Sequence, residues 1–149
     1  VKLVIIGIGP LETKMKELAK SLGISDKIIF TGRVQDSELS VYYNACDIFI
    51  FPAEQTWGLV AIEAMACKKP VVVANRNGVS EVINNGKTGF VVPSRNPKAM
   101  AEKVELLIKN KKLCKKIGNE GYDYVRNNIS WKKYAQNMER IFKKVLKSS

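Results

Sequence analysis

The sequence predicts an α/β fold built on a doubly wound parallel sheet. Short apolar runs alternate with helical patterns along the chain, which is typical of parallel strands joined by crossover helices. The chain has 149 residues, of which 46% are hydrophobic, so it can form one globular domain with a core. Loops at 7–10, 32–36, 52–57 and 75–78 follow apolar runs. Because ligands of such sheets bind beyond the carboxyl ends of the strands, we expect these loops to line one crevice.

Each element is predicted from its own pattern. Strands are expected where the apolar runs lie, at residues 2–6, 28–31, 47–51, 71–74 and 89–92. Helices are expected over about 11–22, 36–45 and 58–67, with a short helix at 78–83. Asp36 can cap the second helix. Asn96 followed by Pro97 is a strong cap for a mostly helical remainder that breaks near Ser130.

The last predicted helix carries an apolar stripe among lysines. Its aromatic and aliphatic residues recur at helical spacing, which predicts a face that packs inward while the lysines point into water. The stripe consists of Trp131, Tyr134, Ala135, Met138, Ile141, Phe142, Val145 and Leu146. We therefore interpret this segment as an amphipathic helix rather than as a patch for nucleic acid.

The composition excludes several classes of chemistry. The chain contains no histidine, which rules out a Ser-His-Asp triad, a histidine base and a histidine-ligated zinc within it. The formal net charge of +11 predicts an anionic partner or substrate. Nucleic acid is not expected, because no groove-reading motif accompanies the charge. A nucleotide diphosphate and an acidic membrane surface both fit it.

The cysteines and the lack of long apolar runs bear on localisation. Cys46, Cys67 and Cys114 have no metal-like spacing, and they predict free thiols in a reducing compartment. No apolar run approaches the roughly 20 residues that a membrane helix needs. We expect a cytoplasmic protein without a metal, and the charge also allows peripheral association with the inner face of an acidic membrane.

The segment from 52 to 73 is the most informative part of the chain. It reads as a strand end, a polar loop, an almost wholly apolar helix and a buried strand. Glu63 is the single charged side chain of that helix, and burying a lone carboxylate is costly unless something pairs with it. The free N–H groups at the start of the helix suit an anion such as a phosphate. Two interpretations stay open: a ligand contact, or a structural pair with Lys87 or Arg33.

Two glycine motifs are weaker signals. The turn at 7–10, which includes Gly9, opens a helix as a dinucleotide fingerprint would, but Glu12 stands where the third glycine belongs. We interpret it as a tight turn that faces a phosphate. The Gly86-Lys87-Thr88 sequence leads into a strand and lacks the earlier glycine of a P-loop, so we expect a structural turn there.

Taken together, these motifs resemble a known family. The turn at 7–10, the Gly32-Arg33-Val34 sequence and the segments 52–73, 78–83 and 85–93 resemble the C-terminal, donor-binding lobe of retaining GT-B glycosyltransferases of family four, group 1. The resemblance covers nearly the whole chain. It implies a Rossmann-like domain that binds a UDP- or GDP-sugar. It also implies transfer of a hexose, with retention and without a metal or other cofactor, to a glycan or lipid-linked acceptor in polysaccharide biosynthesis.

The resemblance also assigns roles to residues. The family has two glutamates separated by seven residues, and the second matches Glu63, which would hold the ribose hydroxyls. The first position is Gln55 here, with Glu54 one residue out of register, so either could face the donor sugar. The remaining donor-binding candidates belong to the loops. They are Gly9, Arg33, Val34 (on the base), Thr56, Trp57, Gly58, Leu59 and Val60, of which Trp57, Gly58 and Leu59 would meet the sugar and Leu59 and Val60 the diphosphate.

The resemblance further implies that this chain is part of a longer enzyme. It predicts a strand and helix ahead of Val1, and that strand would lie between the strands at 2–6 and 47–51. It also predicts an N-terminal lobe that binds the acceptor. Two alternatives stay open: an inactive sugar-nucleotide-binding or scaffolding domain, which Gln55 in place of glutamate favours, and another GT-B enzyme such as a sugar-nucleotide epimerase.

Overall fold

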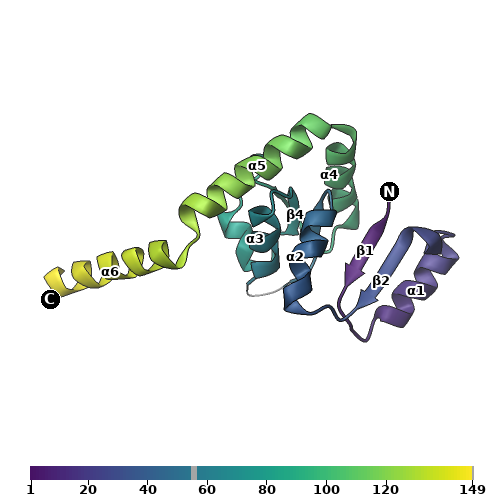
Figure 1. Cartoon of the computed structure of the whole chain (residues 1–149), viewed down its shortest axis with the longest axis horizontal. Coiled ribbons are helices and arrows are strands. Elements are labelled where there is room, and N and C mark those ends of the chain that lie inside the picture. Colours follow the sequence, from purple (N-terminus) through teal and green to yellow (C-terminus); the bar gives the residue numbers. More distant parts are fainter. Residues whose placement is uncertain (55–56, 149) are drawn as a thin grey trace. The chain divides into compact units, whose positions relative to one another are not determined.

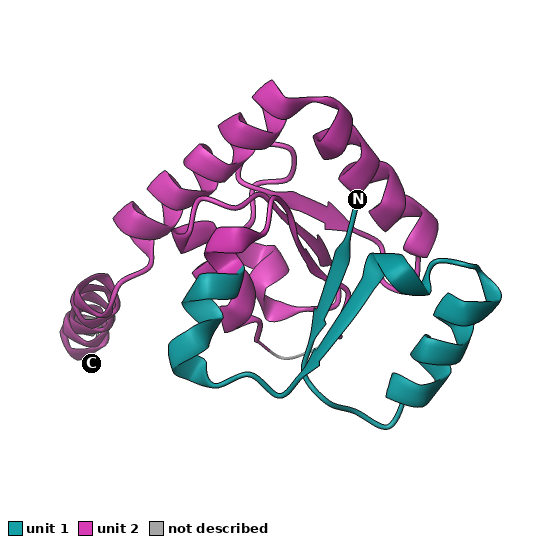
Figure 2. Ribbon diagram, turned by 45° about the vertical axis from the view of Figure 1, so that its right-hand side comes forward, with its two compact units in different colours: residues 1–42 teal, residues 43–149 magenta. Residues whose placement is uncertain are grey.

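The computed structural model describes residues 1–54 and 57–148 (Figure 1). Gln55 and Thr56, two of the predicted site residues, lie outside the described residues. The chain divides into two compact units, Val1–Tyr42 and Tyr43–Ser149, which Figure 2 shows in different colours. We describe each unit by itself.

The first unit is a parallel strand pair with its crossover helix. In chain order it contains β1 (Leu3–Ile6), α1 (Glu12–Ser21), the 3-10 turn η1 (Ser25–Lys27), β2 (Ile28–Gly32) and the start of α2 (Asp36–Ala45). β1 pairs in parallel with β2, with Leu3 opposite Ile28. Gly7, the residue after β1, has a positive φ of 118°, and Gly32, the last residue of β2, has a φ of 67°. The Gly7 N–H donates to the Gly32 carbonyl at 2.9 Å, so the two loops that follow the strands begin side by side.

The second unit is a three-stranded parallel sheet covered by helices. It contains β3 (Phe49–Phe51), α3 (Leu59–Ala66), β4 (Val71–Ala74), the 3-10 helix η2 (Gly78–Val82), β5 (Phe90–Val92), α4 (Pro97–Lys109), α5 (Lys111–Asn128) and α6 (Trp131–Ser148). The strand order is β3-β4-β5, with Phe49 opposite Val71 and Val72 opposite Phe90. The carboxyl ends of all three strands therefore lie at one edge of the sheet.

The core of this unit lies around the central strand. Val71, Val72 and Val73 of β4 are completely buried, as the continuous apolar run at 71–74 predicts for a strand covered on both faces. Leu107 of α4 and Ile117 of α5 join Val72 in one apolar cluster. The two helices are thereby packed on the sheet.

Helix α5 approaches the backbone of the loop between α3 and β4 very closely. A Cβ at Gly118 would overlap the Lys68 carbonyl oxygen, and one at Gly121 would lie 2.9 Å from the Thr88 carbonyl oxygen. Lys68 itself has a φ of 60°, a left-handed conformation that few non-glycine residues adopt. The close approach of α5 to these two carbonyl groups therefore requires glycine at both positions.

The sequence predicted the elements well, and four details differ. The short helix at 78–83 is a 3-10 helix, and β3 begins at Phe49 rather than at 47. The C-terminal remainder has a second break at Asn110, whose side chain accepts a hydrogen bond from the Leu113 N–H and so caps α5. The described strands also form two sheets, β1-β2 and β3-β4-β5, instead of one. A further strand between β1 and β3 stays a prediction.

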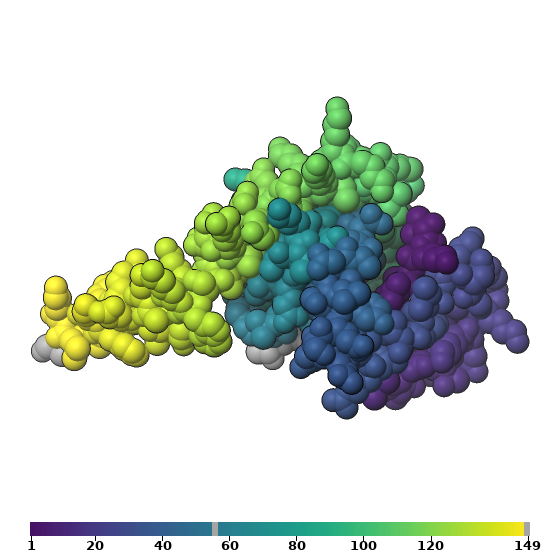
Figure 3. Space-filling view, in the orientation of Figure 1, coloured from purple at the N-terminus to yellow at the C-terminus, as the bar shows by residue number. Residues whose placement is uncertain are grey.

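The prediction that the apolar stripe of α6 packs inward was wrong. Trp131 is 87% exposed and Leu146 is 77% exposed, and most of the other large apolar side chains of the stripe also lie at the surface. Figures 1 and 3 show α6 extending away from the other helices of its unit. Helical spacing identifies an apolar face but does not say what covers it. In the described part of the chain, this face stays largely in water.

Candidate functional site

The three loops that follow β3, β4 and β5 are joined by side-chain hydrogen bonds. Asn75, the first residue after β4, accepts a bond from the Ser94 N–H at 2.9 Å through its Oδ1, and Ser94 lies just beyond β5. The Ser94 Oγ accepts in turn from the Arg76 N–H at 3.1 Å. These bonds hold the loops after β4 and β5 together at the carboxyl edge, where ligands of parallel sheets bind.

Glu54, in the loop after β3, is paired with two arginines. Its Oε1 lies 3.0 Å from Nε of Arg95 and its Oε2 lies 3.4 Å from Nη2. Nη1 of Arg76 is 3.9 Å from the same carboxylate. Arg95 has a φ of 57°, so its backbone adopts a costly left-handed conformation beside this contact. The carboxylate of Glu54 therefore faces the loops after β4 and β5.

The end of this loop is closely packed. Gly58 is buried, and a Cβ there would lie 2.8 Å from Oδ1 of Asn77 and 2.8 Å from Cε1 of Phe51. Asn77 is only 4% exposed, and its Nδ2 donates to the Ala53 carbonyl at 3.3 Å. Sequence reasoning missed Asn77. Asparagine is a preferred N-cap, so its position immediately before Gly78 was an available signal.

Among the described residues, no side chain caps the first turn of α3. Gly58 is the N-cap, and it provides no side-chain hydrogen bond to the N–H groups that follow. Trp57 is 53% exposed and Leu59 is 56% exposed, whereas Val60 is half-buried. Unpaired N–H groups at a helix start carry a partial positive charge that favours anions. The predicted donor-binding residues 57–60 therefore surround this helix start.

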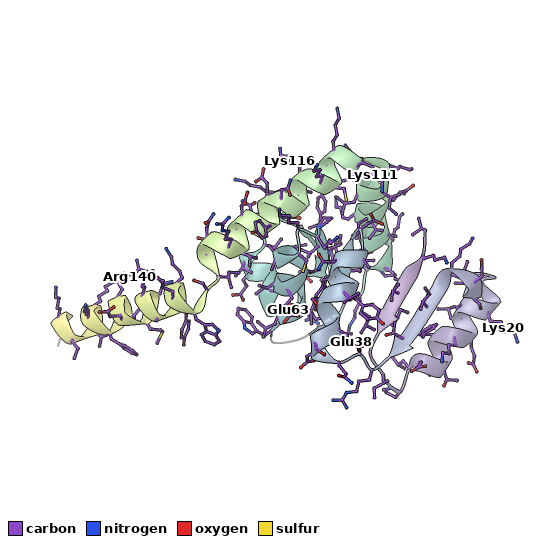
Figure 4. The ribbon with its side chains drawn as sticks, viewed as in Figure 1. Lys20, Glu38, Glu63, Lys111, Lys116 and Arg140 are labelled. Carbon is purple, nitrogen blue, oxygen red and sulfur yellow. The ribbon has the colours of Figure 1, made fainter. Side chains whose placement is uncertain are left out.

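Glu63 lies one turn further along α3, and its surroundings correct the sequence prediction. The sequence predicted a buried carboxylate and left two interpretations open, a ligand contact or a structural pair with Lys87 or Arg33. Instead Glu63, labelled in Figure 4, is exposed. Its Oε2 accepts a hydrogen bond of 2.8 Å from the Tyr43 hydroxyl. The apolar composition of α3 conceals an exposed side, on which Leu59 also lies, four residues before Glu63.

Tyr43 is positioned to orient this carboxylate. It is 6% exposed, and its ring packs edge-on against Phe49 with centroids 5.7 Å apart. Burial raises the pKa of the Tyr43 hydroxyl well above its ordinary value, and the hydrogen bond to the Glu63 carboxylate raises it further. The hydroxyl therefore keeps its proton and remains a donor, which leaves the other oxygen of Glu63 available to a ligand.

The other predicted residues lie in the first unit. Gly9 and Arg33 are exposed and Val34 is half-buried, in the two loops that begin side by side at Gly7 and Gly32. The Gly9 carbonyl accepts from the Glu12 N–H at 3.1 Å, which makes the tight turn that the sequence predicted.

The described residues include neither a metal-binding cluster nor a helix that could cross a membrane. Within 1–54 and 57–148, no three His, Cys, Asp or Glu side chains are grouped so that they could hold a metal ion. None of the described helices is both long enough and apolar enough to span a bilayer.

The family profile described as "Glycosyl transferases group 1" matches residues 1–124. The chain belongs to this family. The glycosyltransferase CapM of Staphylococcus aureus, named for capsular polysaccharide biosynthesis, is 34% identical over 100% of this chain and 39% of its own length. A GDP-mannose-dependent alpha-(1-6)-phosphatidylinositol monomannoside mannosyltransferase of Mycobacterium tuberculosis is 31% identical over 87% of this chain and 36% of its own. This glycosyltransferase chain thus spans well under half the length of these relatives.

A solved structure shows the same fold. The C-terminal domain of the group 1 glycosyltransferase LpcC from Francisella tularensis superposes with a TM-score of 0.82 at 29% identity, over 87% of this chain and 70% of that chain. The predictions of a group 1 glycosyltransferase domain and of a Rossmann-like α/β fold class are therefore confirmed.

Proposed function

We propose that this chain is the donor-binding domain of a glycosyltransferase that uses a nucleotide-diphosphate sugar. The observation that carries the proposal is the Tyr43–Glu63 hydrogen bond beside the uncapped start of α3. It presents an oriented carboxylate, a strong acceptor for sugar hydroxyls, next to N–H groups that suit a diphosphate. The relative from Mycobacterium tuberculosis is described as GDP-mannose-dependent, which supports a nucleotide-sugar donor.

We propose that the residues around the start of α3 bind the donor. Glu63 accepts hydrogen bonds from the ribose hydroxyls, the backbone of Leu59 and Val60 meets the diphosphate, and the backbone of Trp57 and Gly58 meets the sugar. Thr56 belongs to the same donor loop. Gly9, Arg33 and Val34 contribute from the first unit, with Val34 on the base.

The residue opposite the reacting carbon is Gln55 or Glu54. The ion pairs of Glu54 with Arg95 and Arg76 favour Gln55, because they engage the Glu54 carboxylate elsewhere. Gln55 can donate and accept hydrogen bonds to sugar hydroxyls but adds no negative charge. We propose transfer of a hexose with retention, with no metal or other cofactor, to a glycan or lipid-linked acceptor.

A second candidate function rests on one observation. Gln55 replaces the first of the two family glutamates, so the domain could bind a nucleotide sugar without turnover. Transfer by the longer enzyme separates the two functions, since both predict donor binding.

Donor binding is tested by thermal shift on the 149-residue chain. UDP, GDP, UDP-glucose and GDP-mannose are each titrated, with inorganic pyrophosphate as the control for non-specific attraction to a chain of net charge +11. We expect one nucleotide series to raise the unfolding midpoint by mass action, beyond the pyrophosphate control. Equal shifts for pyrophosphate and all nucleotides would mean charge attraction alone and would refute the proposal.

The acceptor site is proposed to lie in an N-terminal lobe that this chain does not include. The isolated chain should therefore bind donor weakly and show no transfer with any donor. Robust transfer by the 149 residues alone would refute this, because it would place the acceptor site within them.

A further inference from the structure

One buried side chain contacts both ends of the loop between β3 and α3. Asn77 is 4% exposed, and its Nδ2 donates at 3.3 Å to the carbonyl of Ala53, two residues after β3 ends. At the other end of the loop, Gly58 packs so closely that a Cβ would lie 2.8 Å from Oδ1 of Asn77. The two ends of the loop are thus held against a single amide group.

The orientation of this amide is fixed by its partners. Oδ1 accepts a hydrogen bond of 3.0 Å from the Val79 N–H, as the N-cap of η2. With the oxygen facing that donor, the NH2 group faces the carbonyl of Ala53. A rotated amide would set its NH2 against the Val79 N–H and its oxygen against the Ala53 carbonyl, so neither bond would form.

The packing leaves no room for a side chain at Gly58. Besides Asn77, a Cβ at Gly58 would meet Cε1 of Phe51 at 2.8 Å and Cγ1 of Val79 at 3.1 Å. Removing the hydrogen bond from Asn77 releases the Ala53 carbonyl at the start of the loop. Any shift of the Asn77 side chain also changes the surface against which Gly58, and Trp57 beside it, is placed.

We propose that Asn77 is a positioning residue that holds Ala53 and Gly58, the two described ends of the loop between β3 and α3. Resting on the proposed function, it thereby places the backbone of Trp57 and Gly58 against the donor sugar. Asn77 acts through the loop and does not touch the ligand. It should therefore affect the contribution of the sugar to affinity more than that of the nucleotide, which Glu63 and the start of α3 hold.

The loop position can be measured without any ligand. The chain has two tryptophans, so Trp131→Phe leaves Trp57 as the single emitter, within the loop itself. In that background Asn77→Asp keeps the side-chain shape and the acceptor for the Val79 N–H but removes the donor to Ala53. Asn110→Asp is the matched control, because Asn110 caps α5 in the same way, accepting from Leu113 N–H at 2.9 Å, at an exposed site.

We expect Asn77→Asp to shift the emission maximum of Trp57 and to raise its quenching by acrylamide, and Asn110→Asp to leave both unchanged. Asn77→Ser serves as a second variant, because serine is also a good N-cap but cannot span the distance to Ala53. It should show the same change. Circular-dichroism melts identify any variant that does not fold, and the other variant then decides.

The second readout uses UDP with UDP-glucose and GDP with GDP-mannose. For whichever of these two ligand pairs the wild type binds, the ratio of nucleotide-sugar affinity to nucleotide affinity measures the contribution of the sugar. In Asn77→Asp this ratio should fall about two- to tenfold, the range for one hydrogen bond. The affinity for the nucleotide alone should change little. Unchanged Trp57 emission in both folded variants would overturn the proposal. An equal loss for nucleotide and nucleotide sugar would overturn the positioning role.

These outcomes separate the two proposals. Altered Trp57 emission in a protein that binds none of the four probes supports the role of Asn77 in the loop and refutes the proposed function. Binding of a probe by the wild type, with Trp57 emission unaltered in the variants, supports the proposed function and refutes the role of Asn77.

Discussion

The Tyr43–Glu63 pair gives the sharpest test of whether Glu63 serves a ligand or the fold. The two changes are Glu63→Gln and Tyr43→Phe, made singly and together. Glutamine keeps an oxygen that can accept from the Tyr43 hydroxyl, so the contact of 2.8 Å can survive without the charge. Phenylalanine removes the hydroxyl and keeps the ring that packs against Phe49.

The magnitudes follow from burial. Glu63 is exposed, so in Tyr43→Phe water can replace the lost donor, and we expect a cost of about 1 kcal/mol rather than the larger value for a buried charged partner. For a chain of this size that lowers the unfolding midpoint by about 2–4 °C. Glu63→Gln should change stability by less than about 0.5 kcal/mol. Its effect should instead fall on nucleotide affinity, by about 1.5–3 kcal/mol, the range for a charged hydrogen bond.

The assay combines thermal melts of the free protein with calorimetric titration of the nucleotide that the wild type binds best. Tyr43→Phe should weaken binding by only about two- to fivefold, because it frees the Glu63 carboxylate without removing it. Glu102→Gln is the matched control, since it removes the same charge from an exposed position of α4. It should change neither quantity.

One result would refute the reasoning. If Glu63→Gln lowers the midpoint as much as Tyr43→Phe does and leaves nucleotide affinity unchanged, the pair serves the fold. The double variant checks this, because two changes within one structural contact should not add.

Three further predictions concern pH, packing and the loop register. Burial and the neighbouring carboxylate raise the pKa of the Tyr43 hydroxyl, so its contribution to stability is complete below the ordinary pKa of about 10 and is lost as the pH rises further. The stability difference between wild type and Tyr43→Phe in denaturant titrations should therefore shrink above about pH 10, and a constant difference would contradict this. Gly118→Ala should destabilise the protein by about 1–3 kcal/mol despite better helix propensity, whereas Asn119→Ala, on the exposed side, should be near neutral in the same melts. In a transferase that contains both this domain and the proposed acceptor lobe, Gln55→Glu should preserve or improve transfer and Gln55→Ala should reduce it; if Glu54→Ala is the damaging change instead, Glu54 faces the sugar.

The fold could be read from the sequence because the strands of this chain are short, apolar and separated by capped helices. The run at 71–74 and the Asn96-Pro97 cap each specify an element locally, and the structure has both. The break at Asn110 was missed because the helical pattern continues across it, and only the capping side chain marks the new start. The exposure of the apolar face of α6 was missed because helical spacing shows that a face is apolar but not whether another element packs against it.

The sequence singled out Glu63 but did not predict its contact with Tyr43. Glu63 stood out as a lone charge in an apolar helix, yet its partner, Tyr43, comes from α2, 20 residues earlier. No local pattern links the two, because they lie on different helices that β3 separates in the sequence. A search for lysine or arginine partners was therefore bound to miss a tyrosine.

The three residues 75–77, which follow β4, hold the loops after β3 and β5 through their side chains. Asn75 bonds to the loop after β5 through Ser94, and Asn77 bonds to the loop after β3 through Ala53. Arg76, between them, reaches the carboxylate of Glu54. Apolar residues place the three strands, but strands alone leave their loops free, and each loop here is held by a polar side chain that follows β4. Since amide groups both donate and accept, one asparagine can join loops whose backbones offer only a carbonyl or only an N–H. The positions of Ala53 and Ser94 thus depend on residues with no hydrophobic periodicity, which is why a sequence pattern that identifies the strands does not describe how their loops are held.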